Sequence, residues 1–278
     1  MNKRVLITGG YGSIGGALFE ALSKDDRFEV FRIPKNDDIC DYNFDSACHS
    51  VDVVIHLCGI VGSDACEIAG MDNAVKVNMI GSARVASYAK KIGARLIYVG
   101  TTASYVPQTI YGKTKLMAEE VCKAIMDKRD LFILRICFAY GPHETHSAIS
   151  KIINCSKNGS LCVLLLDLAK KKDYMYMDDV VEAFKLILAD ESLHGQMDLS
   201  VGKAVPFREV VTTVAKHLSE HGQTFPVTYY RPEADYLGDH IIDSSEFKHI
   251  TGWQPRVSLD EGVEKVITEV FEDDRCSN

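Results

Sequence analysis

The chain has 278 residues, of which 46% are apolar and 25% are charged, and its formal net charge is −8. This length and apolar content allow one large or two small globular units with an ample core. The acidic balance, without a dense basic run, disfavours a nucleic-acid partner, and the longest apolar stretch, 161–166, is far shorter than the roughly twenty residues of a membrane span.

Cysteine spacing bears on metals and on the cellular compartment. The nine cysteines are odd in number, and they form no C-x-x-C pair and no spacing typical of a metal site or a disulfide framework. The sequence therefore predicts no metal and suits a reducing cytoplasm. The N-terminal apolar run is strand-like and too short for the core of a signal peptide.

The first predicted element is a strand at 3–8, which leads into a glycine-rich turn. Gly9, Gly12 and Gly15 have the spacing Gly-x-x-Gly-x-x-Gly, and a helix is predicted over 14–23. Such a turn lets the backbone approach a pyrophosphate and points a helix N-terminus at it. An ordinary loop would look similar, but a strand before the glycines and a helix after them are the context that a dinucleotide site requires.

The second predicted strand, 28–33, bears on the choice of cofactor. A unit that binds NAD usually ends this strand with an Asp or Glu that holds the ribose 2′-hydroxyl. Here Arg32 and Lys35 flank that position, and two cations favour the 2′-phosphate of NADP, unless both are solvated surface charges. NAD remains possible. Asp41 would either accept from the adenine amino group or cap the following helix.

Later elements continue the alternation of strands and helices. Strands are predicted at 53–57, 95–100 and 131–137, and helices at 73–92 and 111–128. This order predicts an α/β fold, a Rossmann-type doubly wound parallel sheet. The active site is expected at the carboxyl ends of its strands.

The less regular second half predicts a smaller C-terminal substrate-binding lobe. We expect the dinucleotide-binding domain to comprise 1–141 and about 173–189. The lobe would comprise 142–172 and about 190–278. The active site is expected between these two parts.

Tyr111 and Lys115 form the most informative pair in the sequence. They lie four residues apart, on one face of the helix predicted there. A lysine ammonium beside a phenol stabilises the phenolate and lowers the tyrosine pKa from its usual value of about 10. A tyrosine with such a pKa can exchange a proton with a sugar or alcohol oxygen near neutral pH.

Together these features resemble the extended short-chain dehydrogenase/reductase family, which includes nucleotide-sugar epimerases, dehydratases and ketoreductases. The resemblance runs nearly from end to end of the chain. Its motifs match the segments 8–15, 53–59, 78–81, 95–102, 111–115, 134–142, 172–180 and 251–262. Each is weak alone, and their shared order and spacing make them specific.

The resemblance implies a role for each matching residue. Tyr111 would be the general acid or base, and Lys115 would hold the nicotinamide ribose. The Thr101 hydroxyl would hydrogen-bond the reacting sugar oxygen, with Thr102 as the alternative in register, and Asn78 would brace the site. The expected cofactor contacts are Gly9, Gly12, Ser13, Ile14, Gly15, Arg32, Asp41, Leu57, Cys58, Gly59, Asn78, Tyr111 and Lys115. Expected substrate contacts are Thr102, His143 and Arg231, although Arg231 could equally be a surface ion-pair partner.

Departures from the family pattern narrow the reaction. The short segment 105–111 resembles certain 4-ketoreductases more than epimerases or dehydratases. Dehydratases need an Asp-Glu pair after the catalytic threonine, where this chain has Thr102 and Ala103. Phe138 replaces an asparagine that usually helps to hold the substrate diphosphate, and Cys58 replaces a small alanine and is interpreted as a packing residue.

The first expectation is therefore an NADPH-dependent reductase of a 4-keto group on a nucleotide-activated sugar, with Tyr111 as general acid. One alternative is a nucleotide-sugar 4-epimerase with tightly bound NAD, and another is a non-enzymatic, cofactor-sensing regulator. A homodimer through helices around 78–92 and 111–128 is expected. The apolar spacing of these helices is equally explained by packing on their own sheet.

Overall fold

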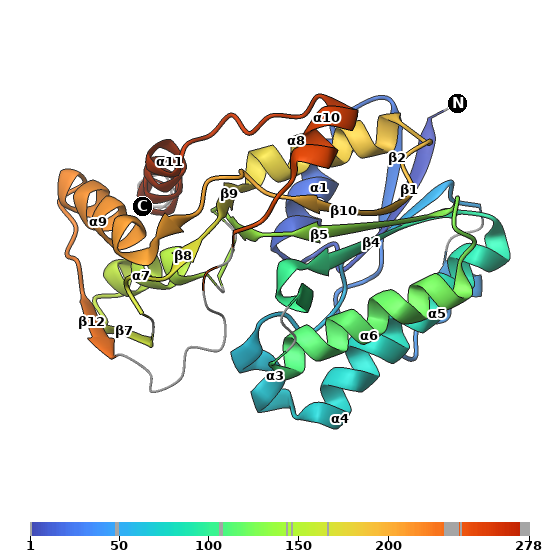
Figure 1. Cartoon of the computed structure of the whole chain (residues 1–278), viewed down its shortest axis with the longest axis horizontal. Helices are drawn as coiled ribbons and strands as arrows, with labels where there is room; N and C mark the ends of the chain where they lie inside the picture. The colour runs from blue at the N-terminus through green and yellow to red at the C-terminus, as the bar shows by residue number, and fades with distance from the viewer. Residues whose placement is uncertain are drawn as a thin grey trace. The chain divides into compact units, whose positions relative to one another are not determined.

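The structure, a computed structural model, describes residues 2–47, 50–105, 108–142, 144–145, 147–165, 167–230, 239 and 241–272. Within it the chain forms two compact units (Figure 1). The first unit comprises Met1–Ile136 and Val181–Leu199, and the second comprises Cys137–Val180 and Ser200–Asn278.

A six-stranded parallel sheet forms the centre of the first unit. Its strand order is β10-β5-β4-β3-β1-β2, and every neighbouring pair runs parallel. The strands are β1 (Lys3–Thr8), β2 (Phe28–Arg32), β3 (Val53–His56), β4 (Arg95–Thr101), β5 (Leu131–Ile136) and β10 (Gly195–Leu199). The strand order reverses between β1 and β3, and such sheets bind ligands at the point of reversal. The predicted fold class is confirmed.

Helices of the first unit pack against this sheet. They are α1 (Ser13–Ser23), α2 (Phe44–Ala47), α3 (Ser63–Ala69), α4 (Met71–Ala74), the π-helix η1 (Val75–Ile80), α5 (Gly81–Ile92), the 3₁₀ turn η2 (Thr102–Tyr105), α6 (Ile110–Ile125) and α8 (Met177–Ala189), which continues from the second unit. Strand residues such as Leu96 and Ile133 pack with Val85 of α5 and Ala118 of α6 in one buried cluster. Burial on both faces explains why the central strands β3, β4 and β5 are mainly apolar.

The second unit contains three small two-stranded sheets. They pair β6 (Phe138–Tyr140) with β9 (Tyr174–Tyr176), β7 (Cys162–Leu165) with β12 (Val227–Tyr230), and β8 (Lys171–Lys172) with β11 (Val205–Pro206). Its helices are α7 (Ala148–Lys157), α9 (Phe207–Glu220), α10 (Ser245–Thr251) and α11 (Leu259–Glu272). In α7, α9 and α11 the inward residues, among them Ile149, Val210 and Val263, form its core. No helix in the described ranges is long and apolar enough to cross a membrane.

The boundaries of the units differ from the expected ones in three stretches. Residues 137–141 and 173–180 belong to the second unit, because β6 pairs with β9 there. Residues 190–199 belong to the first unit, because β10 extends the sheet beside β5. The sequence of β10 has few apolar residues, and strand addition at that position could not be read from it.

Candidate active site

The glycine-rich turn between β1 and α1 is closed by its own backbone. Gly12 N donates to Gly9 O at 2.9 Å, and Gly9 has a φ of 72°. A Cβ on Gly15 would lie 2.2 Å from Gly9 O, and one on Gly9 would lie 2.7 Å from Cys58 N. Glycine at these positions therefore allows the turn to pack against itself and against the segment that follows β3.

The N-terminus of α1 leaves its backbone donors open. The helix begins at Ser13 with Gly12 as its N-cap residue, no side chain caps it, and no acidic residue lies in its first turn. The first amides of a helix lack partners within the helix and attract anions. With the close backbone approach at Gly9 and Gly15, these residues fit the pyrophosphate of a dinucleotide.

Arg32, at the end of β2, is held beside this turn. Its guanidinium carbon lies 3.7 Å from the ring centroid of Tyr11 and 4.0 Å from that of Phe19, and its Nη1 donates to Gly10 O at 3.3 Å. Stacking between two aromatic rings fixes a cation and leaves its remaining donors available. Lys35, the other predicted cation, is exposed.

Asp41 lies at the surface rather than at a helix cap. Its side chain is 79% exposed and lies 3.8 Å from the Nζ atom of Lys76. The cap at α2 comes from Asn43, whose Oδ1 accepts from Asp45 N at 3.2 Å. The alternative that Asp41 caps this helix is therefore wrong, because Asn43 occupies that position.

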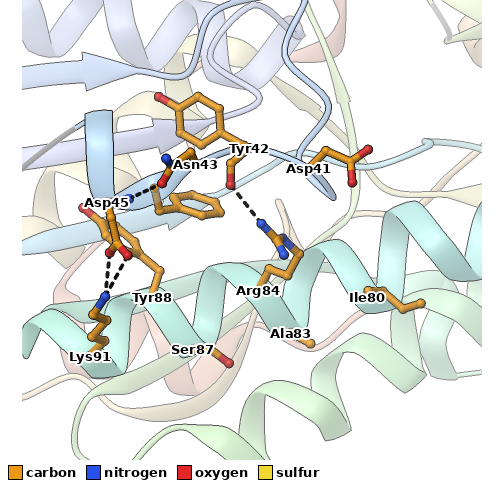
Figure 2. Close-up of a pocket in the computed structure, with 11 residues that line it drawn as sticks. Asp41, Tyr42, Asn43, Asp45, Ile80, Ala83, Arg84, Ser87, Tyr88 and Lys91 are labelled. Atoms are coloured by element: carbon orange, nitrogen blue, oxygen red, sulfur yellow. Dashed lines mark hydrogen bonds and ion pairs between the residues drawn. The ribbon is translucent and has the colours of Figure 1, made fainter.

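A pocket of about 470 Å³ adjoins Asp41 (Figure 2). The two basic side chains in this pocket already contact other residues of the chain. Lys91 Nζ lies 2.7 Å from Asp45 Oδ1, and Arg84 Nη2 donates to Tyr42 O at 2.9 Å. The pocket is lined by Asp41, Tyr42, Asn43, Phe44, Asp45, Ile80, Ala83, Arg84, Ser87, Tyr88 and Lys91. Of the predicted cofactor residues it includes Asp41 alone.

A buried hydrogen-bonded network crosses the ends of β1 and β3. Thr8 Oγ1 lies 2.6 Å from His56 Nδ1, and His56 Nε2 lies 2.9 Å from Ser82 Oγ. Ser82 donates its proton to Asn78 O at 2.5 Å, so it must accept from Nε2–H, and Nδ1 must accept from Thr8. Burial lowers the pKa of His56 to about 3, which keeps this imidazole neutral.

The segment after β3 supplies the next three predicted cofactor residues. Leu57 N donates to Thr8 O at 3.1 Å. The Cys58 side chain packs against the core cluster, and burial raises the pKa of its thiol to about 11, so it is an uncharged packing group. A Cβ on Gly59 would lie 2.8 Å from Asn78 Oδ1, so glycine there admits the asparagine.

Asn78, in the π-helix, joins this segment to α6. Its Oδ1 accepts from Ile60 N at 2.7 Å, and its Nδ2 donates to Ile60 O at 3.1 Å and to Thr114 Oγ1 at 3.0 Å. The buried amide thus connects the loop after β3 with the helix that carries Tyr111. The bond to Thr114 restricts the position of that helix, and the two bonds to Ile60 fix the segment after β3.

Tyr111 meets Thr101 at the carboxyl end of β4. The two hydroxyls are hydrogen-bonded, and burial raises the pKa of Tyr111 to about 12. Thr102 is only 2% exposed and begins η2, so of the two threonines Thr101 is the one that reaches the phenol.

Lys115 lies one helical turn beyond Tyr111 but does not lower its pKa. The Lys115 Nζ atom donates to Val99 O at 2.7 Å and lies 4.4 Å from the Tyr98 ring centroid. The predicted lowering is wrong, because the ammonium points beneath β4 and burial dominates at the phenol. Burial also lowers the pKa of Lys115 itself to about 8.

Two predicted substrate residues cannot be placed, and two groups of buried polar residues were not predicted. His143 and Arg231 lie outside the described residues. The network of Thr8, His56 and Ser82 was not predicted, and neither was a buried ion pair between Glu119 and Arg135 beneath β4. The sequence marked two of these residues only as members of family motifs and did not indicate their partners. His56 ends one strand motif, and Arg135 follows Leu134 in another.

The chain is similar in sequence to a known family and to several known proteins. A family model described as the NAD dependent epimerase/dehydratase family matches residues 5–202. The dTDP-D-glucose 4,6-dehydratase of Mus musculus is 25% identical, over 95% of this chain and 88% of that protein. The dTDP-4-dehydro-6-deoxyglucose reductase of Escherichia coli is 23% identical, over 59% of this chain and 53% of that protein.

A solved structure resembles the whole chain in fold. It is the UDP-glucuronic acid 4-epimerase of Bacillus cereus in complex with UDP-glucuronic acid and NAD. The TM-score is 0.78 at 20% identity, over 96% of this chain and 100% of that one.

Proposed function

The chain belongs to the NAD-dependent epimerase/dehydratase family, and we propose that it is an NADPH-dependent reductase of a 4-keto group on a nucleotide-activated sugar. The family match confirms the resemblance drawn from the motifs. The observation that carries the proposal is the hydrogen-bonded pair of Thr101 and Tyr111 at the end of β4, with the Tyr111 pKa raised to about 12. A phenol with this pKa is protonated at neutral pH, as a general acid must be.

In the proposed reaction Tyr111 gives its proton to the sugar oxygen at C4, and Thr101 hydrogen-bonds the same oxygen. A bound nicotinamide cofactor supplies the hydride. Lys115, with a pKa of about 8, is mostly charged at pH 7 and would hold the nicotinamide ribose. The open amides at Ser13 and Ile14 would bind the pyrophosphate.

Arg32 supports NADPH rather than NADH. Its stacked guanidinium suits a bidentate contact with a 2′-phosphate. Arg32→Met should therefore weaken NADPH binding at least about tenfold relative to NADH, the scale of one charge-assisted hydrogen bond. Lys35→Met is the matched control, because it removes a cation that is exposed. Equal losses for NADPH and NADH in Arg32→Met would argue against a 2′-phosphate site.

Dehydration is not part of the proposal, although one relative is named a dehydratase. Thr102 and Ala103 follow Thr101, so no carboxylate stands where the acid and base of that reaction are expected. A reductase relative is consistent with the simpler reaction.

A 4-epimerase is the second candidate. It is favoured by the similarity in fold to an epimerase that binds NAD and a UDP-sugar. An epimerase would use the same Tyr111 hydroxyl, first to take a proton from the sugar and then to return it.

One experiment separates these two candidates. Purified protein is denatured and its released nucleotide measured, and NADPH consumption is then followed by absorbance with a panel of nucleotide-activated 4-keto sugars. NADPH consumption by a protein purified without nucleotide supports the reductase. Stoichiometric released NAD, with interconversion of UDP-hexoses and no net cofactor consumption, supports the epimerase and overturns the reductase.

We also propose a ligand for each unit, a cellular compartment and an oligomeric state. The first unit would bind the cofactor, and the second would recognise the nucleotide sugar. The cysteine content suits a reducing cytoplasm. A homodimer is supported by exposed apolar side chains on neighbouring helices of the first unit, including Ile80 at 45% and Met117 at 41%.

A further inference from the structure

Glu119 and Arg135 form a buried ion pair between α6 and β5. Glu119 is fully buried and Arg135 is 6% exposed. Arg135 Nε lies 3.1 Å from both carboxylate oxygens, and Nη2 lies 2.5 Å from Oε2. Burying two charges is costly even when they pair well, so such a pair is weak support for a role in stability alone.

The carboxylate lies directly against the strand that carries Thr101. A Cβ on Gly100 would lie 2.6 Å from Glu119 Oε1 and 3.1 Å from Arg135 Cγ. Glycine at this position is what lets the ion pair approach β4, one residue before Thr101. The pair therefore lies immediately beneath the proposed catalytic hydroxyls.

Both members of the pair also contact the turn η2. Ser104 Oγ donates to Glu119 Oε1 at 3.4 Å, and the Arg135 guanidinium carbon lies 4.5 Å from the Tyr105 ring centroid. Tyr105 OH in turn donates to Asp198 Oδ2 of β10 at 2.5 Å. These contacts connect the turn that follows Thr101 with α6, β5 and β10.

Glu119 shares a helix face with Tyr111 and Lys115, each one turn apart. Lys115 faces the Tyr98 ring of β4. Besides burial, its positive charge contributes to lowering the pKa of His56 in β3, so that this imidazole is neutral. Four titratable groups raise the pKa of Lys115, and Glu119 has the largest effect among them. The other three are Cys122, Cys58 and Cys66. Burial raises the pKa of each of these thiols, so the thiols are uncharged at neutral pH.

We propose that Glu119 is a positioning residue, which holds the turn after Thr101 against α6 through its ion pair with Arg135 and keeps Lys115 in its charged form. The role in turnover rests on the proposed function. The effect on Lys115 does not, because it concerns a proton on the protein alone.

The test is a double variant, Glu119→Gln with Arg135→Met, which removes both charges and leaves neither unpaired. Lysine side chains labelled with ¹³C and ¹⁵N are titrated by NMR, and the Lys115 signal is assigned with Lys115→Met. We expect the titration midpoint of Lys115 to fall by up to about one pH unit, the smaller end of the effect of a nearby opposite charge, because the loss of the Arg135 cation offsets part of the loss of the carboxylate. The alkaline limb of the kcat profile should fall with it, while KM for NADPH changes little.

Glu120→Gln is the matched control. It removes a carboxylate from the next residue of α6, which is 63% exposed and pairs with Lys123 at 2.8 Å, and it should leave the Lys115 midpoint unchanged. A folded double variant with an unshifted midpoint would overturn the inference. If the wild-type protein reduced no nucleotide sugar, the proposed function would fail, and the NMR titration would still decide the role of Glu119.

A second variant covers the case in which the neutral pair does not fold. Glu119→Asp keeps the charge and its partner but withdraws the carboxylate by one methylene. It should lower the Lys115 midpoint by less than the neutral substitution does. No movement in a folded Glu119→Asp protein would also count against the inference.

Discussion

At the scale of single residues, the proposed reaction depends most on the hydroxyl of Tyr111. Tyr111→Phe should lower kcat at least about a hundredfold, the usual contribution of general acid catalysis. Fluorescence titration should show NADPH affinity within a few-fold of wild type, because the ring remains. Near-normal turnover would show that another group delivers the proton.

The two adjacent threonines provide a matched comparison. Thr101→Val removes the hydroxyl that bonds Tyr111, and Thr102→Val removes one that is 2% exposed. We expect steady-state kinetics to show a fall in kcat of about tenfold or more for Thr101→Val, from the loss of one hydrogen bond in the transition state. A larger loss of kcat in Thr102→Val, with Tm unchanged, would reassign the catalytic hydroxyl.

Lys115 makes stability depend on pH in a defined direction. Its folded pKa is about 8, against an ordinary value of 10.5, so below pH 8 both states are protonated and the cost of burying the charge is fully present. Between these values the folded protein loses its proton first, and stability rises with pH. Denaturant unfolding should show that, from pH 7 to pH 10, the free energy of unfolding of the wild type rises by about 2 kcal/mol relative to that of Lys115→Met. An unchanged difference would mean that the buried amine is not perturbed.

At the scale of elements, two adjacent glycines in the first turn of α1 allow a matched comparison. A Cβ at Gly15 would meet Gly9 O at 2.2 Å, whereas one at Gly16 has no neighbour within 4 Å. Gly15→Ala should therefore destabilise the protein by about 1–3 kcal/mol and abolish measurable NADPH binding. Gly16→Ala should raise stability by up to about 1 kcal/mol. Thermal unfolding and fluorescence titration check both variants, and retained binding in Gly15→Ala would contradict the proposed pyrophosphate site.

The same elements show how far the sequence could predict this molecule. The glycine spacing and the apolar strands follow local rules, so the turn, the first five sheet strands and the pairing of Tyr111 with Lys115 on one helix could be predicted. The partners of buried polar groups could not, because Thr8 and His56 are 48 residues apart. The direction of the Tyr111 pKa shift was predicted wrongly, since desolvation depends on tertiary packing.

At the scale of the whole molecule, we expect exposed apolar side chains of the first unit to form the interface of the predicted dimer. Met117 of α6 is 41% exposed, and Ile68 and Met71 on α3 and α4 are 88% and 44% exposed. Met117→Glu should convert a dimer to a monomer in light-scattering chromatography, because a charge buried at an interface is costly. Ile250→Glu is the control, since Ile250 is 48% exposed and lies in the second unit. A dimer that persists in Met117→Glu would exclude α6 from the interface.

The π-helix Val75–Ile80 lies within one continuous helical run from Met71 to Ile92. A π-turn closes its hydrogen bond over one residue more than an α-turn does. Asn78 and the residues before it are therefore rotated, relative to α5, from where an uninterrupted α-helix would place them. An alignment with any relative whose corresponding run is wholly α-helical needs a one-residue gap here, and without it Asn78 would be matched to the wrong column.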